Sequence, residues 1–166
     1  MFKIKNILWM GVLALACASC SDDYLTTPPS DLISSVTFYK SATQSEQAII
    51  GLYADMSTLD LNGYIYLSEC RSDNLWVDPH PNALKEYSEI GTFRASYDIV
   101  TFNQVWNLLY KTIYDANVVL SKIDGTEFKS ESTKVQFTGE IRFMRAWAYM
   151  ELARLFGNVP IIDKPV

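Results

Sequence analysis

The chain has little charge, one histidine, three cysteines and no long hydrophobic run. Charged residues make up 20% of its 166 residues, which is too few for an intrinsically disordered chain. The 14 Lys and Arg are outnumbered by 19 Asp and Glu and form no basic run, which excludes nucleic acid as an expected partner. Because His80 has no other ligand at metal-site spacing, the sequence predicts neither a metal site nor a cofactor.

The longest apolar run lies near the amino terminus and is too short for a membrane span. Residues 7–16 supply ten residues, whereas a helix needs about 20 to cross a bilayer. Lys3 and Lys5 precede the run and small residues follow it, which is the layout of a secretory signal. We therefore predict that residues 1–19 are a signal peptide.

The cysteines at the end of this signal predict lipid attachment. Residues 17–20 (CASC) resemble a bacterial lipobox, a signal in which the last cysteine is acylated and becomes the first residue of the mature chain. Cys17 stands where the usual pattern has Leu and is itself an alternative acceptor. Residues 21–23 (SDD) resemble the acidic tag of surface-exported lipoproteins of Bacteroidetes-like bacteria, which favours Cys20. Only Cys70 would then remain, so the mature chain is expected to have no intramolecular disulfide.

Hydrophobic spacing predicts three long helices in the rest of the chain. Apolar residues recur at intervals of three and four over 42–59, 101–123 and 131–156. Ser41 or Thr43 is the expected cap of the first helix. The chain is therefore expected to be all-α.

Shorter or irregular structure is expected between these helices. Residues 64–67 fit either a short strand or a helical turn, and residues 71–100 carry so many turn signals that we predict mostly loop. The polar, proline-containing residues 20–36 are predicted to be a lipidated amino terminus and an extended tether. This leaves residues 37–166 as one helical domain.

The last predicted helix is apolar on two sides. Phe143, Trp147 and Met150 form a second stripe, about a hundred degrees round from the first. A helix that is apolar on two sides is expected to pack between two layers. We therefore expect this chain to be the amino-terminal part of a larger protein.

Four segments together resemble the SusD/RagB family of outer-membrane nutrient-uptake lipoproteins. They are Cys20-Ser21-Asp22-Asp23-Tyr24-Leu25, Ala48-x-x-Gly51-x-Tyr53, Trp106-x-x-x-Tyr110-x-x-Ile113-x-x-Ala116-Asn117, and Gly139-Glu140-x-x-Phe143-x-Arg145-Ala146 running on to Leu155-Phe156-Gly157-Asn158-Val159-Pro160. The resemblance implies a tetratricopeptide-like helical scaffold, of which this chain would be the start. It also implies a non-catalytic lipoprotein of the outer membrane that binds a nutrient, expected to be an oligosaccharide, and delivers it to a SusC-like TonB-dependent transporter.

The region 71–100 holds the residue types that bind sugars. An exposed tryptophan ring can stack on a sugar while amides and a guanidinium bond to its hydroxyls. We predict that the residues of this kind near one another contact the ligand, namely Arg71, Asp73, Asn74, Trp76 and Asn82. The alternatives are that Trp76 covers a small core and that Asp73-Asn74 is only a turn.

Two polar residues on apolar helix faces are predicted to be structural. Asn117 lies with Ile113 and Leu120, and Arg145 lies with Ile141 and Ala148, so each needs a partner inside the protein. Glu140 is a candidate acid for Arg145, and Glu151 with Arg154 is expected to be a weak surface pair.

No residue pattern indicates catalysis. Glu69 and Asp73 are four positions apart, as a pair of hydrolytic carboxylates would be on one helix, but the turn signal at Asp73 argues against that helix. Cys70 is expected to be a small buried residue. Two alternative functions therefore remain, a purely protein-binding helical scaffold and, with less support, a lipid-anchored hydrolase.

Overall fold

The computed structural model describes residues 38–61, 63–78 and 85–165, and it confirms the all-α prediction. The predicted signal peptide, Cys20, the tether, His80 and Asn82 lie outside the described residues. The described helices are α2 (Ala42–Leu61), α3 (Tyr64–Glu69), α4 (Lys85–Gly91), α5 (Val100–Lys122) and α6 (Glu131–Phe156), with a 3-10 turn at Ile123–Gly125. They belong to one unit, Tyr39–Val166.

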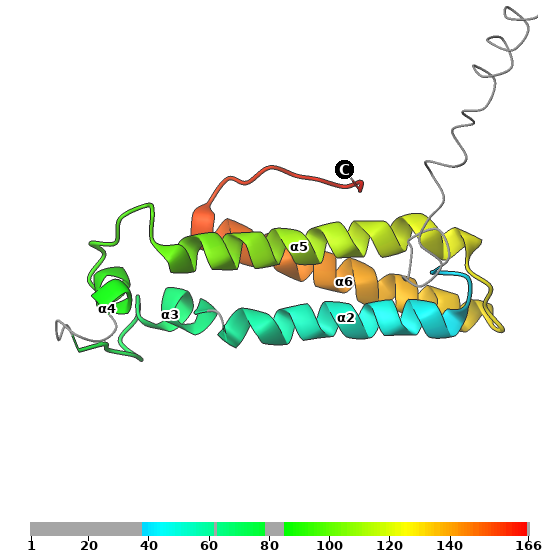
Figure 1. Ribbon diagram of the computed structural model, residues 1–166, viewed down its shortest axis with the longest axis horizontal. Helices are drawn as coiled ribbons and strands as arrows, with labels where there is room; N and C mark the ends of the chain where they lie inside the picture. The colour runs from blue at the N-terminus through cyan, green and yellow to red at the C-terminus, as the bar shows by residue number, and fades with distance from the viewer. Residues whose placement is uncertain (1–37, 62, 79–84, 166) are drawn as a thin grey trace, which may run out of the picture. The chain divides into compact units, whose positions relative to one another are not determined.

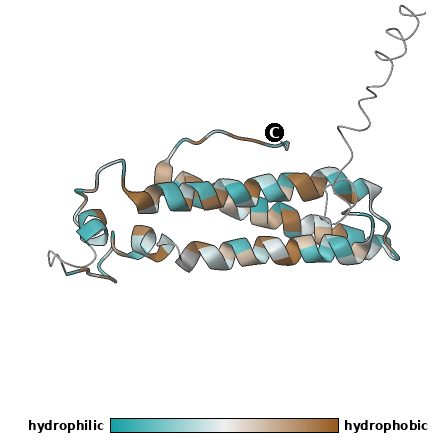
Figure 2. Ribbon diagram, in the orientation of Figure 1, coloured by the Kyte–Doolittle hydropathy of each residue, from teal (hydrophilic) through white to brown (hydrophobic). Residues whose placement is uncertain are grey.

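The three long helices lie side by side, with α5 and α6 as an antiparallel pair and α2 alongside both (Figure 1). Such pairs are the building unit of tetratricopeptide repeats. Along α5, apolar residues alternate with polar ones (Figure 2), and its buried positions include Val105, Leu109, Ile113 and Ala116. Facing residues of α6, such as Met144 and Ala148, are fully buried. The hydrophobic periodicity therefore predicted both the helices and their inner faces.

The first helix begins with a reciprocal cap at Ser41. The backbone N–H of Gln44 donates to Ser41 Oγ at 3.4 Å, and the Ser41 N–H donates to Gln44 Oε1 at 3.2 Å. This is the capping-box arrangement, with Gln in place of Glu. It selects Ser41 over Thr43 from the two predicted caps.

A short helix, α4, lies in the region predicted to be mostly loop, so that prediction was wrong for residues 85–91. Ile90 of α4 is buried, and the Tyr87 ring stacks on Tyr66 of α3 with ring centroids 3.7 Å apart. Glu86 Oε1 accepts the Thr101 N–H at 2.7 Å and so supplies a cap for α5. Contacts with other elements therefore stabilise α4, and its own sequence has no periodic pattern that would predict a helix.

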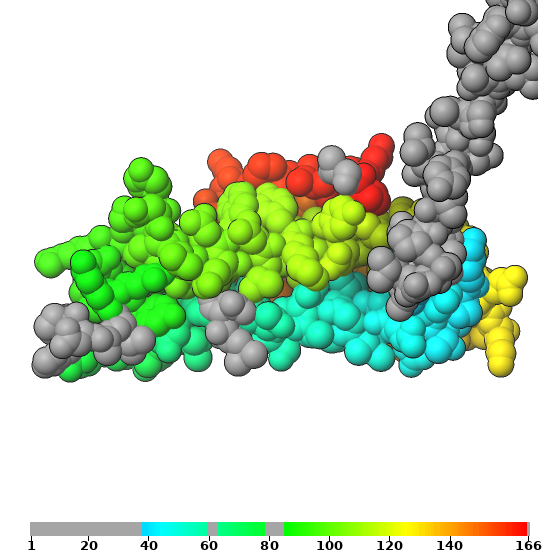
Figure 3. Space-filling view, viewed as in Figure 1, coloured from blue at the N-terminus to red at the C-terminus, as the bar shows by residue number. Residues whose placement is uncertain are grey.

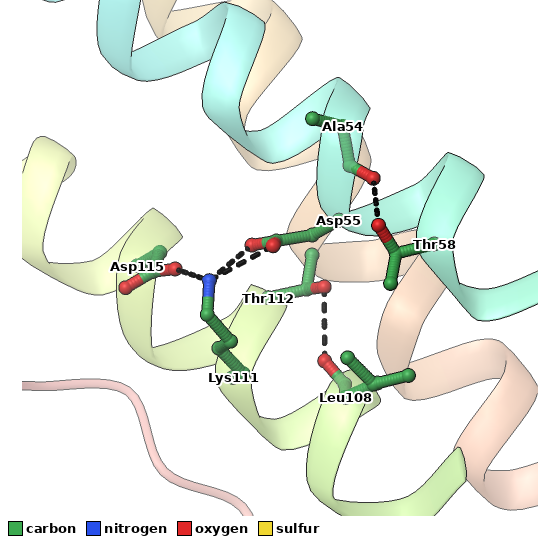
Figure 4. Close-up of polar contacts among 7 residues, drawn as sticks. All are labelled: Ala54, Asp55, Thr58, Leu108, Lys111, Thr112 and Asp115. Atoms are coloured by element: carbon green, nitrogen blue, oxygen red, sulfur yellow. Dashed lines mark hydrogen bonds and ion pairs between the residues drawn. The ribbon is translucent and has the colours of Figure 1, made fainter. Parts of the chain in front are cut away.

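A cluster of three charges links α2 to α5 (Figure 4). Lys111 Nζ lies 2.8 Å from Asp55 on α2 and 2.7 Å from Asp115 on its own helix. These two bonds raise the pKa of Lys111 against the opposing effect of partial burial. Because the Lys111 side chain is half exposed, we expect these ion pairs to add little to stability. Their main effect is expected on how α2 and α5 align.

Glu151 is not the surface residue that the sequence predicted. It is 2% exposed on α6, where its Oε2 accepts the Tyr64 hydroxyl at 2.6 Å and both carboxylate oxygens accept from Arg154. Burial and the bond to Glu151 raise the pKa of Tyr64 to about 12. The sequence prediction was wrong because the partner that meets the Glu151 carboxylate, Tyr64, lies 87 positions away in the sequence.

Asn117 and Arg145 meet inside the protein and hold the segment that follows α6. Arg145 Nη1 donates to Asn117 Oδ1 at 2.7 Å, and Asn117 Nδ2 donates to the Ile162 carbonyl at 2.9 Å. The Glu140–Arg145 pair considered from the sequence does not form, since Glu140 accepts from Gln136. We call residues 158–165 the strap, because this segment runs back along α5 (Figure 1).

Two more tyrosines fix the strap. The Tyr149 hydroxyl accepts the Ile162 N–H at 2.6 Å and donates to its carbonyl at 2.8 Å, while the Tyr110 hydroxyl donates to the Pro160 carbonyl. Gly157, at φ +80°, ends α6 as predicted and turns the chain toward this position. All of these hydrogen bonds to the strap are thus made by side chains of α5 and α6.

The second apolar stripe of α6 is largely uncovered by the described residues. Phe143 is 63% exposed and Met150 is 50% exposed, whereas Trp147 packs against the core. The expected second layer is therefore not provided by the described part of the chain. None of the described helices combines the length and the apolar character needed to cross a membrane.

Candidate functional site

The predicted ligand residues that the structure describes lie just after α3, but they do not form one group. Arg71 borders one hollow, and Asp73 and Trp76 border another. All three side chains are exposed. The turn that follows α3 separates them because consecutive residues in it point in different directions.

Asn74 takes part in this turn. Its backbone N–H donates to Ser72 Oγ, and its side-chain amide donates to Glu69 Oε2 at 3.2 Å. The bond also occupies one oxygen of Glu69, the residue considered with Asp73 as a catalytic pair. Asn74 therefore has the turn role that the sequence offered as an alternative.

The hollow beside Arg71 has a volume of about 410 Å³ and walls made largely of aromatic rings. We call it the Arg71 hollow; its main lining residues are Arg71, Tyr97, Phe102, Asn103, Trp106 and Phe156. Tyr97 is 92% exposed, and Trp106 packs edge-on against Phe156 with ring centroids 5.1 Å apart. Its size lies within the usual range for small-molecule sites.

Free polar groups face solvent around these rings. Neither the Arg71 guanidinium nor the Asn103 amide has a hydrogen bond or ion pair among the described residues, and both side chains are exposed. A flat apolar surface edged by a guanidinium and an amide suits a ligand that has an apolar face and a polar rim.

The second hollow, beside Trp76, is smaller and has fewer rings. Its volume is about 330 Å³, and we call it the Trp76 hollow; it is bordered by Cys70, Asp73, Leu75, Trp76, Ser88 and Thr92. Trp76 is 76% exposed, so it does not act mainly as the cover of a small core. Its ring is available to a ligand at the edge of this hollow.

Sequence reasoning missed Tyr97, Phe102 and Asn103. These residues lie on both sides of the start of α5 and reach the Arg71 hollow only because the chain folds back after α4. A signal was present for Phe102 alone, since Phe102 and Trp106 are four positions apart and share a helix face.

Neither a metal-binding group nor a readily ionised cysteine occurs among the described residues. No group of three His, Cys, Asp or Glu side chains suited to a metal ion occurs among them. Cys70 is buried, as predicted. This burial, and to a lesser extent the negative charge of nearby Glu69, raises the pKa of the Cys70 thiol. A raised pKa disfavours the thiolate, which is the reactive form.

The chain is similar to SusD-like proteins over most of its length. A SusD-like family model, described as "Starch-binding associating with outer membrane", matches residues 23–166. A SusD-like protein of Formosa agariphila is 28% identical over 99% of this chain and 32% of its own length. A SusD-like protein of Bacteroides ovatus is 26% identical over 98% of this chain and 29% of its own length.

The chain spans about a third of the length of these curated relatives. No solved structure matches it. The family match nevertheless covers nearly everything after the predicted lipidation site, including all the described helices. The chain therefore belongs to the SusD-like family, as its sequence motifs predicted.

Proposed function

We propose that this chain is part of a cell-surface lipoprotein that binds an oligosaccharide at the Arg71 hollow. The observation that carries the proposal is the meeting of several aromatic rings, among them the exposed Tyr97, with an unpaired guanidinium and amide in one hollow. Sugar rings have apolar faces and hydroxyl edges, so they match both parts of this surface. The description of the family as starch-binding supports the same ligand class.

Trp76 and Asp73 are proposed to contact the same ligand at a second point. The two hollows lie on either side of the turn 71–74, and Trp76 presents its ring to solvent there. Asn82, which lies outside the described residues, remains a proposed contact on the strength of the sequence alone. No cofactor is needed for binding of this kind.

The anchoring and the partner are also proposals. Acylation of Cys20 would place the protein on the outer membrane, where a SusC-like TonB-dependent transporter would receive the ligand. The family description associates its members with that membrane. Radiolabelled palmitate should enter the wild-type chain in a bacterial host and be absent from Cys20→Ala; equal labelling of both would contradict this anchor.

A protein-binding scaffold without a ligand is the second candidate function. The exposed apolar stripe of α6 favours it, because uncovered Phe and Met side chains are typical of protein interfaces. A scaffold would not need the free polar groups of the Arg71 hollow. Sugar binding therefore separates the two candidates.

Replacing residues of the Arg71 hollow should weaken sugar binding. We expect Arg71→Ala to lower affinity for an oligosaccharide by about 10- to 100-fold, since a hydrogen bond from a charged group contributes roughly 1.5–3 kcal/mol. We expect Trp76→Ala to lower it less, about threefold, because one aromatic contact contributes only about 0.5–1.5 kcal/mol. Calorimetric titration of the full chain with malto-, cello- and xylo-oligosaccharides measures both.

The matched control is Phe143→Ala, which removes an exposed ring on α6 and should leave affinity unchanged. Equal loss in the control, or an Arg71→Ala variant that binds like the wild type, would count against the Arg71 hollow. If no oligosaccharide binds the wild-type chain while a partner protein does, the scaffold function replaces this one.

A further inference from the structure

A row of aromatic rings runs along α5 beyond the Arg71 hollow. We call Phe102, Trp106, Tyr110 and Tyr114 the α5 aromatic row; each residue is four positions from the next. Four residues advance a helix by about 6 Å, so neighbouring rings are stacked along the helix axis. The Trp106 and Tyr110 ring centroids are 4.9 Å apart, and Tyr114 is 45% exposed.

The strap and one part of this row border a third hollow. This strap hollow has a volume of about 390 Å³ and is lined by Trp106, Tyr110, Ile113, Tyr114, Pro160 and Ile162. One wall is the α5 aromatic row and the other is the strap, which lies against α5 (Figures 1 and 3). The bonds to Pro160 and Ile162 hold that second wall in place.

Trp106 lines both the Arg71 hollow and the strap hollow, so these two hollows are neighbours along α5. Arg71 and Asn103 stand at one end, and Tyr114 stands at the other. From Phe102 to Tyr114 the helix advances by about 18 Å. This length exceeds a single sugar ring and suits an extended chain of several rings.

Two exposed amide side chains stand next to rings of the row in the sequence, and one of them, Asn103, lines the Arg71 hollow. Asn103 and Asn107 each follow a ring of the row by one position, and both are exposed with no hydrogen bond among the described residues. Planar amides can bond to adjacent hydroxyls of a sugar. A purely apolar ligand would offer these amides no hydrogen-bond partner.

We propose that the α5 aromatic row continues the sugar site, so that a linear, uncharged oligosaccharide extends from the Arg71 hollow over Trp106 and Tyr110 to Tyr114. The proposal rests on the proposed function and adds the length and charge of the ligand. No charged side chain lines the strap hollow, which is why uncharged sugar rings fit it. An acidic polysaccharide would find no positive partner there.

The test compares a short and a long ligand on the full chain. Calorimetry with two-ring and six-ring members of the malto, cello and xylo series should show tighter binding of the six-ring ligand in the series that binds. Tyr114→Ala should then lower affinity for the six-ring ligand about three- to tenfold, the loss expected for one aromatic stacking contact, and leave the two-ring ligand unchanged.

The matched control is Tyr53→Ala on α2, which removes a similarly exposed tyrosine that lines neither the Arg71 hollow nor the strap hollow. Equal affinity for both ligand lengths, or a Tyr114→Ala variant that behaves like the control, would overturn the extended site alone. Sensitivity to Arg71→Ala would still support the proposed function in that case. If no oligosaccharide binds the wild-type chain, both proposals fail together.

Discussion

Replacing Asn117 by Ala is expected to lower the free energy of unfolding by about 2–3 kcal/mol. Asn117 is 2% exposed and bonds to Arg145 on α6 and to the Ile162 carbonyl of the strap. Its removal leaves the guanidinium without this acceptor and the carbonyl without one of its donors. Leaving a buried polar group without its hydrogen-bond partner costs more free energy than a hydrogen bond at the surface contributes.

Chemical denaturation of the full chain measures the Asn117→Ala effect, and hydrogen exchange of the Ile162 amide measures the strap separately. We expect this amide to exchange faster in the variant, because the segment opens more readily. Gln104→Ala is the matched control, since it removes an exposed amide from the same helix and should change stability by less than about 0.5 kcal/mol. Equal stability of the Asn117→Ala and Gln104→Ala variants would show that the buried bonds contribute little.

Replacing Glu151 by Ala is expected to lower the free energy of unfolding by about 2 kcal/mol. The buried carboxylate accepts bonds from Tyr64 and Arg154, so the change leaves the Tyr64 hydroxyl without its partner. Arg154 is more than half exposed and can return to water, which limits the loss. Met150→Ala, on the exposed side of α6, is the control and should change stability by under about 0.5 kcal/mol.

The same contact predicts a pH dependence at alkaline pH. Because the folded-state pKa of Tyr64 is about 12, above its ordinary value of 10.0, the folded protein holds the phenolic proton more tightly than the unfolded chain. The stabilisation is therefore complete below pH 10 and is lost as the pH rises towards 12. Since Tyr64 is only partly buried, solvent screening reduces the loss to roughly 1 kcal/mol.

Denaturation of wild type and Tyr64→Phe between pH 8 and 12 isolates this contribution. The difference in unfolding free energy between the two should shrink as the pH rises above 10, because the variant has no proton to lose at this position. A difference that stays constant over that range would mean that the Glu151 bond does not shift the titration of Tyr64.

The long helices could be predicted from the sequence with small errors at their ends. The predicted spans 42–59, 101–123 and 131–156 correspond to α2, α5 and α6, and the end of α6 at Gly157 was anticipated. Helix α4 could not be predicted in this way because it has only seven residues and contains Ser and Gly. Its stability comes from Tyr66, Thr101 and the buried contacts of Ile90.

The candidate site was only partly predictable for a related reason. Arg71 and Trp76 could be chosen by residue type, and both are exposed beside hollows. Their separation into two hollows depends on the direction of each side chain in the turn after α3. Tyr97 and Asn103 lie beside Arg71 because the chain turns back into α5. No local sequence pattern predicts this turn.

Sequence alone determined the three long helices, most of their inner faces and the family, because the helical repeat and the family motifs are properties of residues close together in the chain. Tertiary structure alone decided which groups meet. Asn117 meets Ile162, Glu151 meets Tyr64, and the rings of α5 meet the strap, each across tens of residues. Such contacts arise when whole helices bury their apolar faces, and the positions of the polar groups follow from that packing.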